Sequence, residues 1–304
     1  MGREAFTFGP LVDLVATWKE EVESIADFHQ IKAYDVGDRE SMTAKRGIYS
    51  HQMDAIRRGR CMECWMMPEF CLCGKFTPAV IPHKLVVYYH FKEVYRSSNT
   101  GKVMLNSLND VEYYIRGVND ADWLKQLEET KPSNVLVLFP LKNHSITVSE
   151  YLEQLALKRA TGSTPSSFSA PSEGDDKANK PVEPLTIIML DGTWSNARLL
   201  AKGVPEFIPR VRVTPTERSL FRLRTQTQAD RICTLEAFAL LLQELQDLRP
   251  CEQETKAAEV LISNLKIHVD GGKAQSHRNV PFNTREPPRN IMPLNPQKKG
   301  KDFF

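Results

Sequence analysis

A short segment at residues 185–202 carries the residues best placed for chemistry. Five apolar residues, some of them β-branched, lead into Asp191-Gly192-Thr193-Trp194, a pattern typical of a buried parallel strand that ends in a tight turn. Residues 195–200 then continue at helical spacing. Ligands of open α/β sheets bind where strands end and helices begin, so the pattern predicts a site at Asp191 and Trp194. The alternative is that Asp191 only caps the helix and Trp194 belongs to the core.

A second group with chemical potential is formed by cysteines. Four of the six cysteines lie within thirteen positions, as C-x2-C followed by C-x-C. Zn²⁺ prefers four tetrahedral ligands at about 2.3 Å from each sulfur, and two close pairs joined by a short loop supply them. Free thiols are the alternative in a reducing compartment. We predict a structural zinc knuckle without an open coordination position, with the ligands Cys61, Cys64, Cys71 and Cys73.

Composition and charge limit the class of protein. The 304 residues are 41% hydrophobic and 26% charged, with a net charge of +2, which is typical of a globular protein without a membrane span. The first residues do not follow the pattern of a signal peptide, so we expect an intracellular location, in the nucleus or the cytoplasm. Residues 196–231 hold eight basic and three acidic residues. This surplus favours contact with phosphates, and a solvated face is the alternative.

The hydrophobic pattern predicts the elements that position these groups. Strands are expected at residues 84–90, 134–140, 185–190 and 207–213. Helices are expected at residues 11–30, 103–108, 151–159, 195–200, 234–248 and 255–269. Thr147 and Glu150 form the pattern of a capping box before the helix at 151–159. Together these elements indicate an α/β fold with a mostly parallel sheet flanked by helices.

The chain divides into four predicted parts. Residues 1–58 are an N-terminal helical extension, residues 59–78 are the zinc knuckle, and residues 79–270 are the main α/β domain. Within that domain, residues 160–184 are rich in Ser, Pro, Gly and Ala, which predicts a disordered insertion. Residues 271–304 are rich in proline and basic residues, which predicts a flexible tail.

Several motifs occur together in one order. Between residues 60 and 248 the chain contains C-x2-C, C-x-C, HFKEVYRSSNTG, VLVLFP, DGTW, RSLFRLR and CTLEA, and this combination resembles the DTW-domain family. The resemblance implies a SPOUT-like sheet with a trefoil knot, an exception to the rule against knots. It also implies a tRNA-uridine aminocarboxypropyltransferase. Such an enzyme moves the 3-amino-3-carboxypropyl group of S-adenosylmethionine to N3 of uridine, giving acp3U and 5′-methylthioadenosine.

Two other functions stay open at this point. One is an RNA methyltransferase that uses the same S-adenosylmethionine donor. The other is a non-catalytic zinc-knuckle protein that binds RNA. In all three cases RNA is the expected partner, and tRNA is the partner that the resemblance implies.

The resemblance, together with the charge and chemistry of the residues, suggests roles for individual residues. Asp191, Thr193 and Trp194 are expected to be catalytic, with Asp191 either removing the N3 proton of uridine or binding substrate. Trp194 or Tyr95 is a candidate for stacking on the uracil, whereas His90 is expected to be structural. The expected cofactor-binding residues are Phe139, Pro140, Asp191, Gly192, Thr193, Leu220, Arg222, Leu223, Arg224, Thr234 and Glu236. The expected RNA-contacting residues are Arg57, Arg58, Asn99, Thr100, Arg198 and Lys202.

Cys233 departs from the family pattern, which has serine at this position. A serine there would cap the following helix and form a capping box with Glu236, whereas cysteine is a poor cap. Either Thr234 caps the helix or the first turn is weakened. We therefore expect Cys233→Ser to raise the free energy of unfolding by up to about 1 kcal/mol.

Overall fold

The centre of the molecule is a six-stranded sheet of order β2-β1-β5-β3-β6-β4, in which every pair of neighbours is parallel. The computed structural model describes residues 9–23, 36–129, 134–141, 144–162, 183–224 and 231–278. The strands are β1 (Lys84–Tyr89), β2 (Val111–Ile115), β3 (Val135–Leu138), β4 (Ser145–Ile146), β5 (Thr186–Asp191) and β6 (Arg210–Val211). The predicted α/β class is confirmed, and the trefoil knot stays a prediction.

The central strands are apolar throughout because both faces of the sheet are buried. In β1, Leu85 and Val87 belong to one core and Val86 and Tyr88 to the other, as the two-residue period of a strand requires. Strands buried on both faces appear in the sequence as continuous apolar runs. For this reason the apolar runs of β1, β3 and β5 can be recognised as strands in the sequence.

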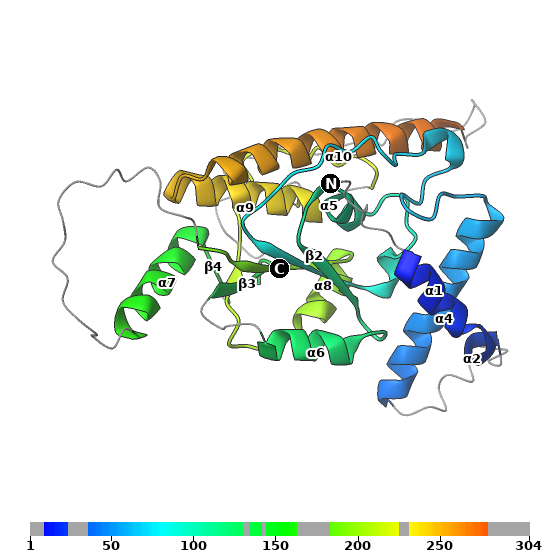
Figure 1. Cartoon of the computed structure of the whole chain (residues 1–304), viewed down its shortest axis with the longest axis horizontal. Coiled ribbons are helices and arrows are strands. Elements are labelled where there is room, and N and C mark those ends of the chain that lie inside the picture. Colours follow the sequence, from blue (N-terminus) through cyan, green and yellow to red (C-terminus); the bar gives the residue numbers. More distant parts are fainter. Residues whose placement is uncertain are drawn as a thin grey trace, which may run out of the picture.

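Helices cover both faces of the sheet (Figure 1). One face packs against α5 (Gly101–Ser107), α9 (Thr234–Leu248) and α10 (Glu252–Arg278), and the other against α6 (Asp120–Glu129) and α8 (Trp194–Ala201). At one end of the molecule lie α1 (Gly9–Thr17), α2 (Lys19–Glu23) and α4 (Val36–Arg57), and at the other lies α7 (Val148–Gly162). Two short 3₁₀ helices, η1 (Pro68–Phe70) and η2 (Phe91–Glu93), complete the described elements.

The structure corrects several predicted boundaries. The helix expected at residues 11–30 begins as two helices, α1 and α2, and residues 24–30 lie outside the described part. The last helix, α10, continues to Arg278, so the prediction of a flexible tail from residue 271 is wrong for residues 271–278. This part of α10 contacts the cysteine-rich segment, since the side-chain oxygen of Gln275 accepts the Met67 N–H at 2.7 Å. The rest of that tail and residues 163–182 of the predicted insertion lie outside the described residues.

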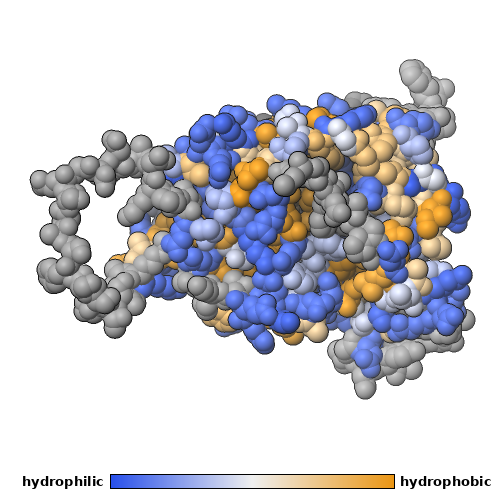
Figure 2. Space-filling view, viewed as in Figure 1, coloured by the Kyte–Doolittle hydropathy of each residue, from blue (hydrophilic) through white to orange (hydrophobic). Residues whose placement is uncertain are grey.

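The surface of the described residues is mostly hydrophilic on the side seen in Figure 2, with separate hydrophobic patches. Exposed large apolar side chains are distributed over different elements, for example Leu14 on α1 and Leu124 on α6. In the described part of the chain, none of the helices has the length and apolar character that a bilayer crossing requires.

Candidate active site

A cavity of about 650 Å³ opens where β3 and β5 end. Its wall contains Phe139 and Pro140 after β3, the turn at residues 191–194 after β5, and parts of the loops at 98–100, 212–215 and 231–234. Because the strands are parallel, these ends meet at one edge of the sheet. This edge is where ligands of open α/β sheets bind.

Asp191 is the last residue of β5 and lies in the wall of this cavity. Its side chain is 4% exposed, and both carboxylate oxygens accept hydrogen bonds. The Thr234 hydroxyl donates to Oδ1 at 2.6 Å, and the side-chain amide of Asn99 donates to Oδ2. Asp191 is not the helix cap, because the Thr193 hydroxyl holds that position and accepts the Asn196 N–H at 3.4 Å.

The surroundings of Asp191 make its carboxylate a stronger base. Burial, together with the negative charge of Glu93, raises the pKa of Asp191 to about 6. Hydrogen bonds from Thr234 and Asn99 and the charge of Arg224 act in the opposite direction and limit this rise. A carboxyl with a pKa of about 6 is ionised at neutral pH and still basic enough to accept a proton from a substrate.

A buried ion pair forms the next part of the cavity wall. Glu93 is 1% exposed, and its carboxylate accepts hydrogen bonds from Arg224 at 2.5 Å and from Arg96 at 3.3 Å. Arg224 also donates to the Ser98 hydroxyl at 3.0 Å. A buried carboxylate needs such partners, so this pair fixes the loop after β1 against residue 224. Glu93 is not among the expected site residues, although an acid four positions after the end of a buried strand is a recognisable signal.

The aromatic side of the cavity is formed by Trp194 and Phe139. Their ring centroids are 6.0 Å apart, and the guanidinium of Arg231 lies 4.7 Å from the centroid of the half-buried Trp194 ring. Tyr95 does not line the cavity. It is 4% exposed, packs on Trp65 at 5.6 Å and accepts a hydrogen bond from Gln52, which removes it from the stacking candidates.

His90 is held as a structural residue. Its Nδ1 accepts the Lys92 N–H at 3.3 Å, and its ring stacks on Phe91. Burial lowers the pKa of His90 to about 4, so the ring is neutral at physiological pH.

The structure brings many of the expected site residues into one cavity. Asn99 and Thr100, assigned above to RNA contact, are 1% and 5% exposed and also lie in its wall. Asn99 donates to Asp191, and the burial of both side chains does not fit contact with an external polyanion. The expected residues that line the cavity are Phe139, Pro140, Asp191, Gly192, Thr193, Trp194, Arg224, Thr234, Asn99 and Thr100.

Other expected residues lie outside the cavity wall. The Glu236 carboxylate accepts hydrogen bonds from the Cys233 N–H, the Ser219 hydroxyl and the Leu220 N–H, so it fixes the segment before residue 221 to the first turn of α9. Arg57 and Arg58 are exposed and pair with Asp54. The expected residues outside the wall are Leu220, Arg222, Leu223, Glu236, Arg57, Arg58, Arg198 and Lys202.

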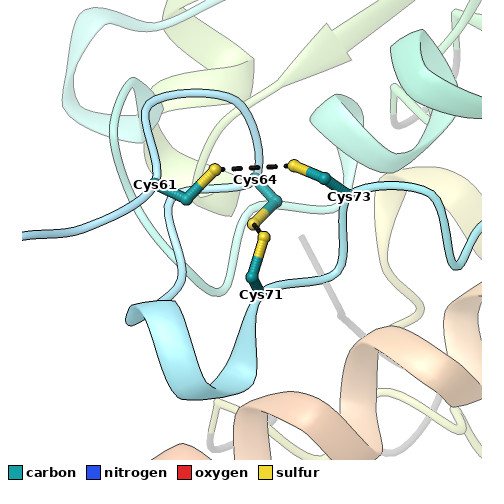
Figure 3. A group of neighbouring side chains, drawn as sticks. All are labelled: Cys61, Cys64, Cys71 and Cys73. Atoms are coloured by element: carbon teal, nitrogen blue, oxygen red, sulfur yellow. Dashed lines mark hydrogen bonds between the residues drawn. The ribbon is translucent and has the colours of Figure 1, made fainter.

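The four cysteines meet in a separate cluster beside α10 (Figure 3). All four sulfurs lie within 4.8 Å of one another, with 3.4 Å between Cys61 and Cys73 and 3.6 Å between Cys64 and Cys71. Tetrahedral Zn²⁺ with sulfur ligands at about 2.3 Å requires sulfur separations of roughly 3.8 Å, so the cluster fits the ion. Four cysteines therefore can bind zinc here, and such a site would be closed to substrate.

An all-parallel sheet flanked by helices, with a buried carboxylate in a cavity at the carboxyl edge, defines an α/β protein with a ligand site at its strand ends. A family model described as the DTW domain matches residues 58–270, and the chain belongs to this family. Membership supports a function in tRNA modification. No solved structure matches the chain.

Proposed function

We propose that the protein transfers the 3-amino-3-carboxypropyl group of S-adenosylmethionine to N3 of a tRNA uridine, with release of 5′-methylthioadenosine. The observation that carries this proposal is the carboxylate of Asp191, buried in the cavity wall and held by Asn99 and Thr234 within the DTW match. The cavity volume of about 650 Å³ lies within the range of cofactor sites.

In the proposed reaction, Asp191 removes the proton from uridine N3. The N3 lone pair then attacks the γ-carbon of the methionyl arm, the carbon–sulfur bond breaks, and its electron pair neutralises the sulfonium as methylthioadenosine leaves. A positioned base contributes typically about 10²- to 10⁴-fold to the rate. Since Asn99 and Thr234 orient both carboxylate oxygens, the base is in place before the substrate binds.

Orientation decides which carbon of the donor reacts. The sulfonium carries three carbons, and transfer of the methionyl arm requires that its γ-carbon faces the nucleophile. Arg224 lines the cavity, and we propose its guanidinium, which also donates to Glu93 and Ser98, as the partner of the methionyl carboxylate. Phe139 and Pro140 provide an apolar wall for the adenine, and Trp194 provides a stacking face for the uracil.

The tRNA is proposed to approach from the side of α8. Arg198 and Lys202 are exposed on and just after this helix, whose first residues line the cavity. Contacts to phosphates from such residues fix the position of the RNA without reading its sequence. Arg57 and Arg58 are a second, more distant candidate for phosphate contact.

Product analysis tests the proposal. Purified protein, tRNA and S-adenosylmethionine should yield methylthioadenosine and acp3U in equal amounts. S-adenosylhomocysteine as the product would indicate a methyltransferase instead. Retention of tRNA without donor binding or turnover would indicate an RNA-binding protein. Asp191→Asn keeps the shape of the side chain and should abolish most of the turnover, and near-normal turnover would eliminate the base role.

A further inference from the structure

A fully buried lysine lies between the cysteine cluster and the cavity. Lys102, in α5, is 0% exposed. Its ammonium donates to three carbonyl oxygens, those of Cys64 at 2.5 Å, Ser97 at 2.8 Å and Arg96 at 3.3 Å. It also lies 4.9 Å from the centroid of the Trp65 ring. The three ammonium protons thus connect a zinc-ligand residue to the loop after η2.

The backbone of the same residue leads to the cavity. The Lys102 N–H donates to the side-chain oxygen of Asn99 at 2.7 Å, and the Asn99 amide nitrogen donates to Asp191. Three hydrogen bonds through two residues, Lys102 and Asn99, therefore join the Cys64 carbonyl to the carboxylate of Asp191. The amide orientation of Asn99 is fixed from both sides, because its oxygen is an acceptor and its nitrogen a donor.

Chemistry explains why a lysine rather than an apolar residue occupies this position. Burying an ammonium is unfavourable unless its protons are satisfied, and a methionine of similar length would fill the space without that penalty. With Zn²⁺ bound by four thiolates, the cluster would carry a net charge of −2, which a neighbouring ammonium would stabilise. Packing alone does not explain a lysine at this position, whereas interaction of its charge and its three protons with the cluster and the loop does.

We propose that Lys102 is a positioning residue that couples metal occupancy of the four-cysteine cluster to the geometry of Asp191. Cys64 would hold a metal ion through its Sγ, and this bond would restrict the Cys64 backbone, including the carbonyl that accepts from Lys102. Lys102 transmits this constraint to the loop at residues 96–99, and Asn99 transmits it to the carboxylate. The activity readout of this coupling rests on the proposed function, whereas the structural readouts below do not.

The competing explanation is that the cluster only stabilises the fold as a whole. The cluster also packs on α10, as the contact between Met67 and Gln275 shows. Under that explanation, loss of metal would loosen α9 and α10 as much as the loop at residues 96–102. Coupling through Lys102 predicts a local effect instead.

The test uses the full-length, zinc-loaded protein and the variant Lys102→Met. Lys75→Met is the matched control, because Lys75 is exposed next to the cluster. Zinc content, hydrogen exchange by mass spectrometry, and kcat and KM are measured for each protein. We expect Lys102→Met to retain about one zinc per chain, to exchange faster at residues 96–102, and to lose up to about 100-fold in kcat. KM for tRNA and all properties of Lys75→Met should stay unchanged.

The proposal would be overturned if zinc-loaded Lys102→Met shows the same hydrogen-exchange rate at residues 96–102 as the wild type. If this variant does not fold, the wild-type protein provides the test. Its hydrogen exchange is then measured before and after zinc is removed with a chelator. Faster exchange at 96–102 with α9 unchanged supports the coupling. Equal acceleration in α9 or no change at all refutes it. Neither result depends on turnover, so failure of the proposed reaction is recognised separately by its products.

Discussion

Replacing Thr234 by valine should shift the pH dependence of the reaction to higher pH. The Thr234 hydroxyl donates to Asp191 at 2.6 Å, which stabilises the ionised carboxylate and lowers its pKa. A hydrogen bond to a charged group contributes about 1.5–3 kcal/mol, and one pKa unit corresponds to about 1.36 kcal/mol. Loss of this bond should therefore raise the pKa of Asp191 from about 6 by about one to two units.

The sign of the effect follows from the form that acts as a base. In the proposed reaction only ionised Asp191 can accept the N3 proton, so kcat/KM should rise with pH and reach half of its maximum near the pKa of the free enzyme. In the wild type this midpoint is expected near pH 6. In Thr234→Val the fold loss of kcat/KM should therefore be largest below pH 6, where it approaches about tenfold for each unit of pKa shift, and small above pH 9. The assay is kcat/KM between pH 5 and 9.5, with methylthioadenosine as the measured product.

Glu93→Gln is the matched variant of opposite sign. It removes the negative charge that raises the pKa of Asp191 and leaves Arg224 without its carboxylate partner. Both changes favour the ionised carboxylate, so the midpoint should move below that of the wild type. The rise of kcat/KM with pH is assigned here to ionisation of Asp191. This assignment would be refuted if the midpoints stay equal in all three proteins, or if they move in the same direction in both variants.

Three further predictions concern packing, capping and metal. Gly101→Ala would place a Cβ 2.5 Å from the Tyr89 hydroxyl and 3.0 Å from the Asp191 carboxylate. Thermal unfolding should therefore show a decrease of about 1–3 kcal/mol in the free energy of unfolding. The control Gly203→Ala, whose Cβ would lie 3.4 Å from its nearest atom, should be tolerated. The N-cap of α9 is Cys233, which forms a capping box with Glu236, so the expectation that Thr234 caps this helix is wrong. A serine hydroxyl accepts more strongly than a thiol, so Cys233→Ser should raise stability by up to about 1 kcal/mol. A neutral or negative change in the unfolding midpoint would contradict this. Protein purified without chelator should contain about one zinc per chain, and a content far below one would remove the zinc assignment of the four-cysteine cluster.

The turn after β5 was predictable because all of its signals are local. An apolar run, Asp191-Gly192 and a helical pattern occur within one short segment, and the structure has β5 and α8 there. The capping box of α7 is equally local, and Thr147 and Glu150 form both of its hydrogen bonds. In contrast, β4 has only two residues, which is too short for a period to be recognised. The strand β2 was missed although VEYYI is rich in β-forming residues, because three of its residues are half-buried aromatic or charged side chains.

The partners of Asp191 could not be predicted from spacing. Asn99 precedes it by 92 positions and Thr234 follows it by 43, and only the sheet order brings the three together. The pairing of Glu93 with Arg224 spans 131 positions and depends on how residues 212–224 lie over the strand ends. No local pattern encodes such contacts.

The position of β5 affects how the chain folds during synthesis. This strand lies between β1 and β3, yet both of its neighbours leave the ribosome earlier, because chains emerge from the N-terminus. Until residues 186–191 are made, β1 and β3 each present an unpaired edge, a situation that invites association with other chains. The ligand cavity is completed later still, when α9 supplies Thr234. Nascent chains that stop before this helix should therefore require protection by a chaperone and should be unable to retain a small ligand.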